Sequence, residues 1–362
     1  MIRHPLSLWL WPLLLATSLA LAACGSSDQA SAQASATGAA ADYPDEPTLE
    51  TSQAKLDAAL QCTPYTHPDK APVLLVHGTF TAGFEQYDWT YLPLLADLGF
   101  DVCIVTYPDR GLGDMQVSAE YVVNALRRMR AKSGRKVAVV GHSQGATMPR
   151  WALKWWPSAR AAVDDLVMLA GPNHGTTATA GLTDALAKVP GLSSLPIGLL
   201  PEAFYQFSPD SNFVKTLNSG DETPGDISYT SIYSGFYDEL VEPARPVPTA
   251  GLDWGQTKPN VVNILLQDVC PGRFVDHVTI GLTDELAFDL VLDAISHAGP
   301  ADVARAGGKT LCGLLPIVPS QIIAPQIISG LIQALKQEPA NGLPNPHLTS
   351  KEPPLKAYAQ AQ

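Results

Sequence analysis

Short apolar runs alternate with segments of helical spacing along most of this chain. Residues 137–140 (Val-Ala-Val-Val) are typical of the runs, which have the length and β-branched content of buried strands. Residues 117–129 are typical of the other pattern, with apolar side chains three or four positions apart. The predicted strands cover residues 72–77, 100–107, 136–140, 163–170, 227–233 and 261–266. The predicted helices cover residues 89–98, 117–129, 146–156 and 282–297.

This alternation predicts an α/β fold with a mostly parallel sheet and helices on both faces, because strands buried on both sides read as continuous apolar runs. Functional side chains are expected in loops at the carboxyl ends of the strands. Two regions break the alternation. Residues 181–213 predict either a lid over an apolar site or an insertion packed on the core. Residues 316–337 predict a terminal helix from Ser320 onward.

The first residues have the pattern of a bacterial lipoprotein signal. A basic start at Arg3 precedes an apolar stretch over 6–20, and Leu21-Ala22-Ala23 then places small residues before Cys24. We expect a signal peptide over 1–23 and lipidation of Cys24, which would attach the exported chain to a membrane. An uncleaved membrane anchor and a plain secretory signal are the alternatives.

The remaining domain boundaries follow from composition. Residues 24–45 are rich in Ala, Ser, Gln and Gly, and predict a flexible tether. A catalytic domain is expected over 46–340, followed by a loosely ordered tail over 341–362, which is polar and proline-rich.

Composition and charge narrow the classes of function. The chain has 362 residues, of which 46% are hydrophobic and 16% charged, as expected for a globular protein with a large core. Its net charge of −12 argues against nucleic acid as a partner, because phosphate binding favours a basic face. The sequence leaves the oligomeric state open.

Five cysteines fit an exported chain. If Cys24 carries lipid, then Cys62, Cys103, Cys270 and Cys312 remain, which suggests two disulfides in one of three pairings. These four cysteines lack the close spacing of a zinc site, so we predict no metal.

The strand over 136–140 leads into Gly-His-Ser-Gln-Gly at 141–145 and then into a helix. This is the context of a nucleophile turn, in which a strained backbone exposes a serine hydroxyl above the sheet. Ser143 is therefore the predicted nucleophile. Side chains at Gly141 and Gly145 would crowd the strand and the helix where they meet.

A serine nucleophile needs a base, and the base needs an acid that holds its tautomer. In this type of fold the chain order is serine, acid, histidine. His277 follows the last strand and is the predicted base. Asp238 follows the strand before it and is the predicted acid, with Glu239 as its nearest competitor. The other histidines after the nucleophile (His174, His297 and His347) and the acid Asp276 are less well placed.

The oxyanion hole requires backbone donors near the nucleophile. The amide of Gln144 is the first expected donor, and the loop over 78–80 after the first strand supplies the second. Thr79 could add its hydroxyl group. We expect no cofactor.

With these residues in view, the chain resembles lipases of the Candida antarctica lipase B type, within the α/β-hydrolase fold. The resemblance covers roughly residues 62–312 and rests on six segments: 74–79, 116–121, 143–145, 156–160, 238–241 and 269–277. It implies a triad of Ser143, Asp238 and His277, an oxyanion hole of Thr79 and Gln144, and Cys62–Cys103 and Cys270–Cys312 disulfides.

The sequence departs from those lipases at three places. His142 stands where they have a pocket tryptophan, so their acyl and alcohol preferences do not carry over. His77 replaces a proline before the oxyanion loop. Residues 172–176 (Pro-Asn-His-Gly-Thr) are closer to other bacterial lipases.

Three hypotheses about function follow. The first is a lipase-like carboxylic ester hydrolase that acts on triacylglycerols or related lipids through an acyl-enzyme. The second keeps the same site but acts on a polyester or transfers acyl groups to alcohols. The third is a surface lipoprotein that binds lipid or a partner without turnover, which has no need of a complete triad.

Overall fold

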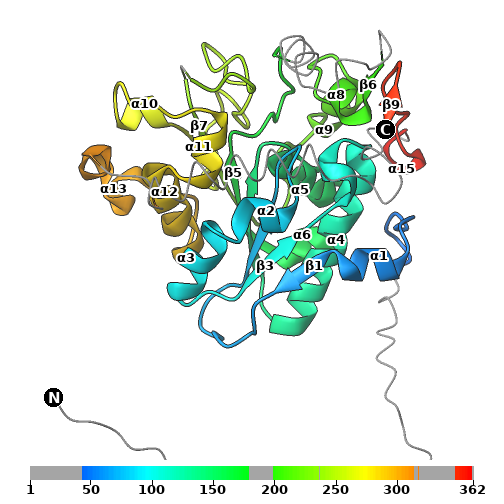
Figure 1. The fold of residues 1–362 in the computed structure, drawn as a ribbon, viewed down its shortest axis with the longest axis horizontal. Coiled ribbons are helices and arrows are strands. Elements are labelled where there is room, and N and C mark those ends of the chain that lie inside the picture. The colour runs from blue at the N-terminus through cyan, green and yellow to red at the C-terminus, as the bar shows by residue number, and fades with distance from the viewer. Residues whose placement is uncertain (1–42, 179–198, 236, 314–316, 318–346, 361–362) are drawn as a thin grey trace, which may run out of the picture. The chain divides into compact units, whose positions relative to one another are not determined.

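A sheet of seven strands forms the centre of the fold (Figure 1). The computed structural model describes residues 43–178, 199–235, 237–313, 317 and 347–360. The strand order is β1-β3-β2-β4-β5-β7-β8, and every adjacent pair is parallel except β1 with β3. The predicted α/β fold is therefore confirmed. The strands are β1 (Leu60–Cys62), β2 (Val73–Val76), β3 (Val102–Val105), β4 (Val137–His142), β5 (Val163–Leu169), β7 (Ser228–Tyr233) and β8 (Val261–Leu265).

Helices cover both faces of the sheet, and alternate strand residues pack against each layer. In β2, Leu74 and Val76 join one apolar cluster with α4, α5 and α6, whereas Val73 and Leu75 join a second cluster with α3 and α12. The helices are α1 (Gln53–Ala58), α2 (Gly83–Tyr87), α3 (Tyr91–Asp97), α4 (Met115–Ser133), α5 (Gln144–Trp155), α6 (Pro157–Ala162), α8 (Glu202–Gln206), α9 (Asn212–Leu217), α10 (Leu266–Val269), α11 (His277–Leu282), α12 (Glu285–Ser296), α13 (Val303–Ala306) and α15 (Ala357–Gln360).

The helix predicted over 282–297 corresponds to α12, which begins three residues later, at Glu285. Helix α11 ends at Leu282, and Asp284 then caps α12 by accepting a hydrogen bond from the amide of Ala287 at 2.9 Å. An aspartate at this position favours a new helix start over a continuous helix. The apolar periodicity alone does not show the exact start of the helix.

Strand β1 was not predicted, because its three residues carry too little apolar pattern. It pairs with β3 so that Cys62 lies opposite Cys103, and the two form a disulfide. A second disulfide joins Cys270 to Cys312. Both pairings are those that the resemblance implied.

The C-terminal tail is not loosely ordered where the structure describes it. Strand β9 (Leu348–Thr349) pairs with β6 (Leu200–Pro201). Tyr358 of α15 packs its ring against three tryptophans of α5 and the start of α6, and its hydroxyl accepts a hydrogen bond from Trp151 Nε1 at 3.0 Å. The prediction from composition was wrong for residues 347–360 because these contacts are distant in sequence.

The predicted lid and terminal helix fall largely outside the described residues. Residues 179–198 and 318–346 are not described, and the described part of the first region forms β6, α8 and the start of α9. Gln206 of α8 accepts a hydrogen bond from the amide of Met115 at 2.8 Å and thereby caps α4. Among the described helices, none combines the length and apolar character that spanning a membrane requires.

Candidate active site

Ser143 lies at the sharp turn between β4 and α5. Its backbone adopts φ 57° and ψ −127°, a region that a serine rarely occupies. The turn needs glycine on either side. A Cβ on Gly141 would lie 2.0 Å from the carbonyl oxygen of Gly145, and one on Gly145 would lie 2.1 Å from that of Val76. The strained turn therefore presents the Ser143 hydroxyl at the end of the sheet.

The structure brings Ser143, His277 and Asp238 into one hydrogen-bonded chain. His277 Nε2 lies 2.9 Å from Ser143 Oγ, and His277 Nδ1 lies 3.0 Å from Asp238 Oδ1. The carboxylate accepts from Nδ1–H, so Nε2 is left free to accept the serine proton. His277 is the first residue of α11 rather than a loop residue.

The competing acids are placed differently. Asp276 caps α11 by accepting hydrogen bonds from the amides of Val278 and Thr279. Glu239 is exposed, and its Oε2 is 3.5 Å from the backbone nitrogen of His277. Neither carboxylate contacts the imidazole in the way that Asp238 does.

The other candidate histidines contact other carboxylates. His174 contacts Glu222 at 3.0 Å, His297 contacts Asp293 and His347 contacts Asp109. Each of these three side chains is engaged with a carboxylate other than Asp238. The choice of His277 from the order of residues along the chain therefore agrees with the geometry.

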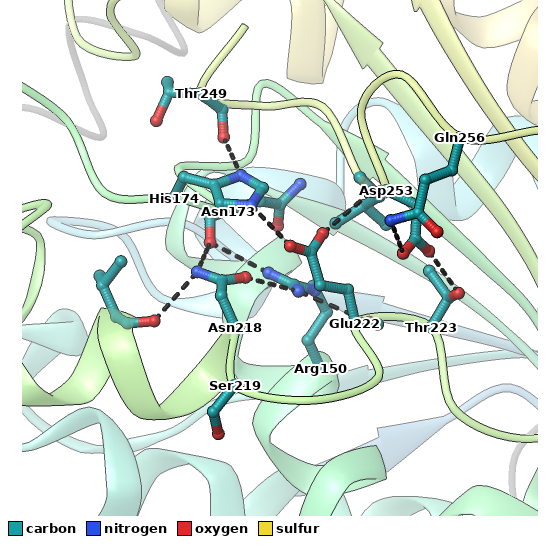
Figure 2. A network of polar contacts seen from close by, with 12 residues as sticks. Arg150, Asn173, His174, Asn218, Ser219, Glu222, Thr223, Thr249, Asp253 and Gln256 are labelled. Carbon is teal, nitrogen blue, oxygen red and sulfur yellow. Dashed lines mark hydrogen bonds and ion pairs between the residues drawn. The ribbon is translucent and has the colours of Figure 1, made fainter. Parts of the chain in front are cut away.

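His174 belongs to a buried polar network around Arg150 of α5 (Figure 2). The Arg150 guanidinium donates to the Asn173 carbonyl at 3.0 Å and to the Asn218 side chain at 2.9 Å. Burial lowers the pKa of Arg150, although the Glu222 carboxylate opposes that shift. This network holds the loop after β5 against α5, and sequence reasoning did not identify it.

Asp238 and His277 stabilise each other's charge in a buried setting. Burial raises the pKa of Asp238, but the charge and hydrogen bond of His277 and the amides of Val241 and Leu240 outweigh it, so the pKa is lowered. Burial lowers the pKa of His277, but the charge and hydrogen bond of Asp238 outweigh it, so that pKa is raised above 6.5. Asp238 thus stays ionised, and His277 can accept a proton.

The loop after β2 lies against Ser143 and contains the Thr79 hydroxyl group. A Cβ on Gly78 would lie 3.1 Å from Ser143 Cβ, so this loop touches the nucleophile. The Thr79 hydroxyl oxygen is buried, and no residue in the described part of the chain forms a hydrogen bond with it. Gln144 begins α5 directly after Ser143, and its side chain donates to the Gly111 carbonyl at 2.8 Å.

A second loop, after β3, holds the loop after β2 in place. Arg110 forms an ion pair with Glu85, with Nη2 to Oε1 at 2.7 Å, and both side chains are buried. The Phe80 amide donates to the Arg110 carbonyl at 2.8 Å. Asp109 and Arg110 both have positive φ, near 52° and 53°. Sequence reasoning missed this support, because neither loop has a motif that indicates it.

Exposed apolar side chains lie next to the triad residues in the chain. Tyr237 precedes Asp238 and is 41% exposed, and Val278 follows His277 and is 37% exposed. Phe274 is 65% exposed and lies ring to ring with Tyr237 at 4.3 Å. Exposed apolar side chains therefore lie within three residues of Asp238 or His277 along the chain. Within the described ranges, no cluster of His, Cys, Asp or Glu is arranged to hold a metal ion.

Residues 73–306 match a model of the alpha/beta hydrolase family, which is more than half of the chain. The chain belongs to the alpha/beta hydrolase family. Lipase B of Pseudozyma antarctica is 32% identical over 285 residues, which cover 77% of this hydrolase and 78% of that lipase. The crystal structure of Aspergillus fumigatus lipase B is 29% identical with a TM-score of 0.72, and the match covers 87% of this chain and 74% of that one. Together these findings identify a serine ester hydrolase.

We expect the pKa of His277 to depend mainly on Asp238. Asp238→Asn removes the carboxylate, so the pKa of His277 should fall because burial then meets less opposition. An NMR titration of the imidazole protons measures this shift without any substrate. Glu239→Gln is the control, and its shift should be smaller because Glu239 is exposed. An unchanged His277 pKa in Asp238→Asn would contradict the assignment of Asp238 as the partner.

Proposed function

We propose that this hydrolase cleaves acyl esters of lipids, such as triacylglycerols, through an acyl-enzyme on Ser143. The observation that carries the proposal is the continuous hydrogen-bonded chain from Ser143 through His277 to Asp238, located at a strained turn at the end of the sheet. A serine in that position gains nucleophilicity only when a base can take its proton. A binding protein would not need the complete set.

The contacts support the following sequence of steps. Ser143 Oγ attacks the ester carbonyl carbon while His277 Nε2 takes the hydroxyl proton. The Gln144 amide and Thr79 stabilise the oxyanion, and the unpaired Thr79 hydroxyl is available for this role. His277 then gives the proton to the leaving alcohol, which leaves an acyl group on Ser143.

Deacylation uses the same residues in reverse roles. His277 takes a proton from water, the resulting nucleophile attacks the acyl carbon, and the acid is released as Ser143 regains its proton. Asp238 remains ionised throughout, and it stabilises the imidazolium and its orientation. These steps require no cofactor.

Two observations favour a lipid substrate over a small polar ester. Tyr237, Phe274 and Val278 expose apolar surface beside the triad, where an acyl chain would bury it. The relatives that match over most of the chain are both named lipase B.

We expect Ser143→Ala to abolish hydrolysis of p-nitrophenyl esters while the fold is retained. The measurement uses the domain that starts at residue 43 and an acyl series from short to long chains. Ser133→Ala, at the end of α4, is the matched control and should leave the rate unchanged.

A preference for long chains would support the lipase assignment. Hydrolysis of polyester films, or ester formation with added alcohols in place of hydrolysis, would shift the assignment to the second hypothesis. A folded wild-type domain without activity on any of these substrates would contradict the proposed function.

We further propose that the exported chain is anchored through lipidated Cys24. The sequence before Cys24 and two disulfides typical of an oxidising compartment support this location. In a bacterial host, the wild-type protein should fractionate with membranes, with a mass that corresponds to loss of residues 1–23 and addition of lipid. Cys24→Ala should abolish the lipid mass. An unlipidated wild-type protein would exclude the anchor.

A further inference from the structure

His142 lies between the oxyanion loop and the helix that carries the base. It is the last residue of β4, directly before Ser143, and its side chain is buried. Its Nε2 is 2.7 Å from the backbone oxygen of His277, and its Nδ1 is 3.2 Å from Gln86 Nε2. The His142 and His277 rings are 5.0 Å apart between centroids. The triad itself does not use His142.

Gln86 of α2 continues the chain of hydrogen bonds to the oxyanion loop. Its Oε1 accepts from the Gly78 amide at 2.9 Å and from the Thr81 hydroxyl at 2.8 Å. Gly78 is the residue before Thr79, and a Cβ on it would lie 3.1 Å from Ser143 Cβ. A single buried path therefore links the loop beside the nucleophile to the backbone of the catalytic histidine.

The donors and acceptors along this path have only one consistent arrangement. The Gly78 amide can only donate, so Gln86 presents its oxygen to it and its NH2 group to His142. The His277 carbonyl can only accept, so His142 carries its proton on Nε2 and accepts at Nδ1. Burial lowers the pKa of His142 to about 3, and the nearby His277 adds to this shift. His142 therefore stays neutral at the pH values at which an ester hydrolase acts.

The surrounding backbone is fitted to the imidazole ring. A Cβ on Gly281 of α11 would lie 2.2 Å from His142 Cδ2, so the helix that begins at His277 rests directly on the ring. On the other side, a Cβ on Gly78 would lie 3.4 Å from His142 Nδ1. The helix that carries the base and the loop that carries an oxyanion donor are thus both packed against His142.

We propose that His142, together with Gln86, is a positioning residue that holds the base His277 and the oxyanion loop in one hydrogen-bonded frame. This proposal rests on the proposed function of the triad. Loss of the frame would let the base and the oxyanion donors move relative to each other. A misplacement of about 1 Å can lower a catalytic rate by up to about 100-fold.

The kinetic test compares replacements of matched shape. His142→Gln retains an N–H donor toward the His277 carbonyl, whereas His142→Met has a similar length and no donor. Gln86→Met removes the contacts to Gly78 and His142. The number of active sites is titrated with a fluorophosphonate, so that kcat refers to folded enzyme only. His297→Gln, at an exposed histidine, controls for the substitution itself.

We expect kcat to fall on the order of 10- to 100-fold in His142→Met with KM little changed. His142→Gln should recover part of the loss. Gln86→Met should lower kcat less, and the double variant should be no worse than His142→Met, because both residues act through one path. An unchanged kcat per titrated site in His142→Met would overturn the proposal. So would a double variant whose loss of kcat equals the product of the two single losses.

A second measurement needs no ester. In ¹H–¹⁵N spectra of the wild-type domain, with His142→Gln used to assign the signals, His142 should show a proton on Nε2 only. It should not titrate between about pH 5 and pH 8, where an ordinary histidine does. A proton on Nδ1, or titration in that range, would overturn the frame even in an active enzyme. A correct tautomer in a protein without ester turnover would instead count against the proposed function alone.

Discussion

The contact between the start of α5 and the end of β2 is the constraint on which the site depends. With no side chain at Gly145, the helix backbone approaches the Val76 carbonyl, and with none at Gly141 the strand and helix approach each other. That approach accompanies the strained backbone conformation of Ser143 and brings the start of α5, where Gln144 lies, close to the end of β2. Ser143 and the start of α5, which holds one of the two proposed oxyanion donors, are therefore positioned by the same packing contact.

Buried charge is the second constraint, and it is satisfied in pairs. Burial by itself would destabilise the charged form of Asp238. The carboxylate is stabilised because it accepts hydrogen bonds from His277 and from two backbone amides. Glu85 and Arg110 form a further buried pair, which holds the loop after β2. His142, in contrast, is neutral. It therefore places no positive charge beside His277 that would oppose protonation of the His277 imidazole. His277 thus lies between an acid whose pKa is lowered and a second histidine whose pKa is lowered.

Sequence reasoning identified the parts of this site that depend on local pattern and chain order. The apolar runs located six strands, and the glycines around Ser143 located the turn, because both signals lie within a few consecutive residues. The order of strands then led to Asp238 and His277, which the structure brings within hydrogen-bond distance. The disulfide pairing came only through the resemblance to a known family.

The missed features depend on contacts between distant segments. Strand β1 is defined by its pairing with β3, and residues 347–360 by Tyr358 packing on the tryptophans of α5. Gln86 lies on a five-residue helix with no motif, and its role emerges only when Gly78 and His142 meet it. Asp109 and Arg110 adopt positive φ although neither is glycine, so the sequence does not indicate this backbone conformation. Local pattern cannot report such features.

A crystal structure of the domain treated with an alkyl phosphonate tests the central claim most directly, because the tetrahedral phosphorus mimics the intermediate of ester hydrolysis. We expect the phosphorus bonded to Ser143 Oγ, with the phosphoryl oxygen within hydrogen-bond distance of the Gln144 amide and Thr79. His277 should remain bonded to Asp238. Modification of another residue, or a phosphoryl oxygen directed away from Gln144 and Thr79, would contradict the assignment of this site.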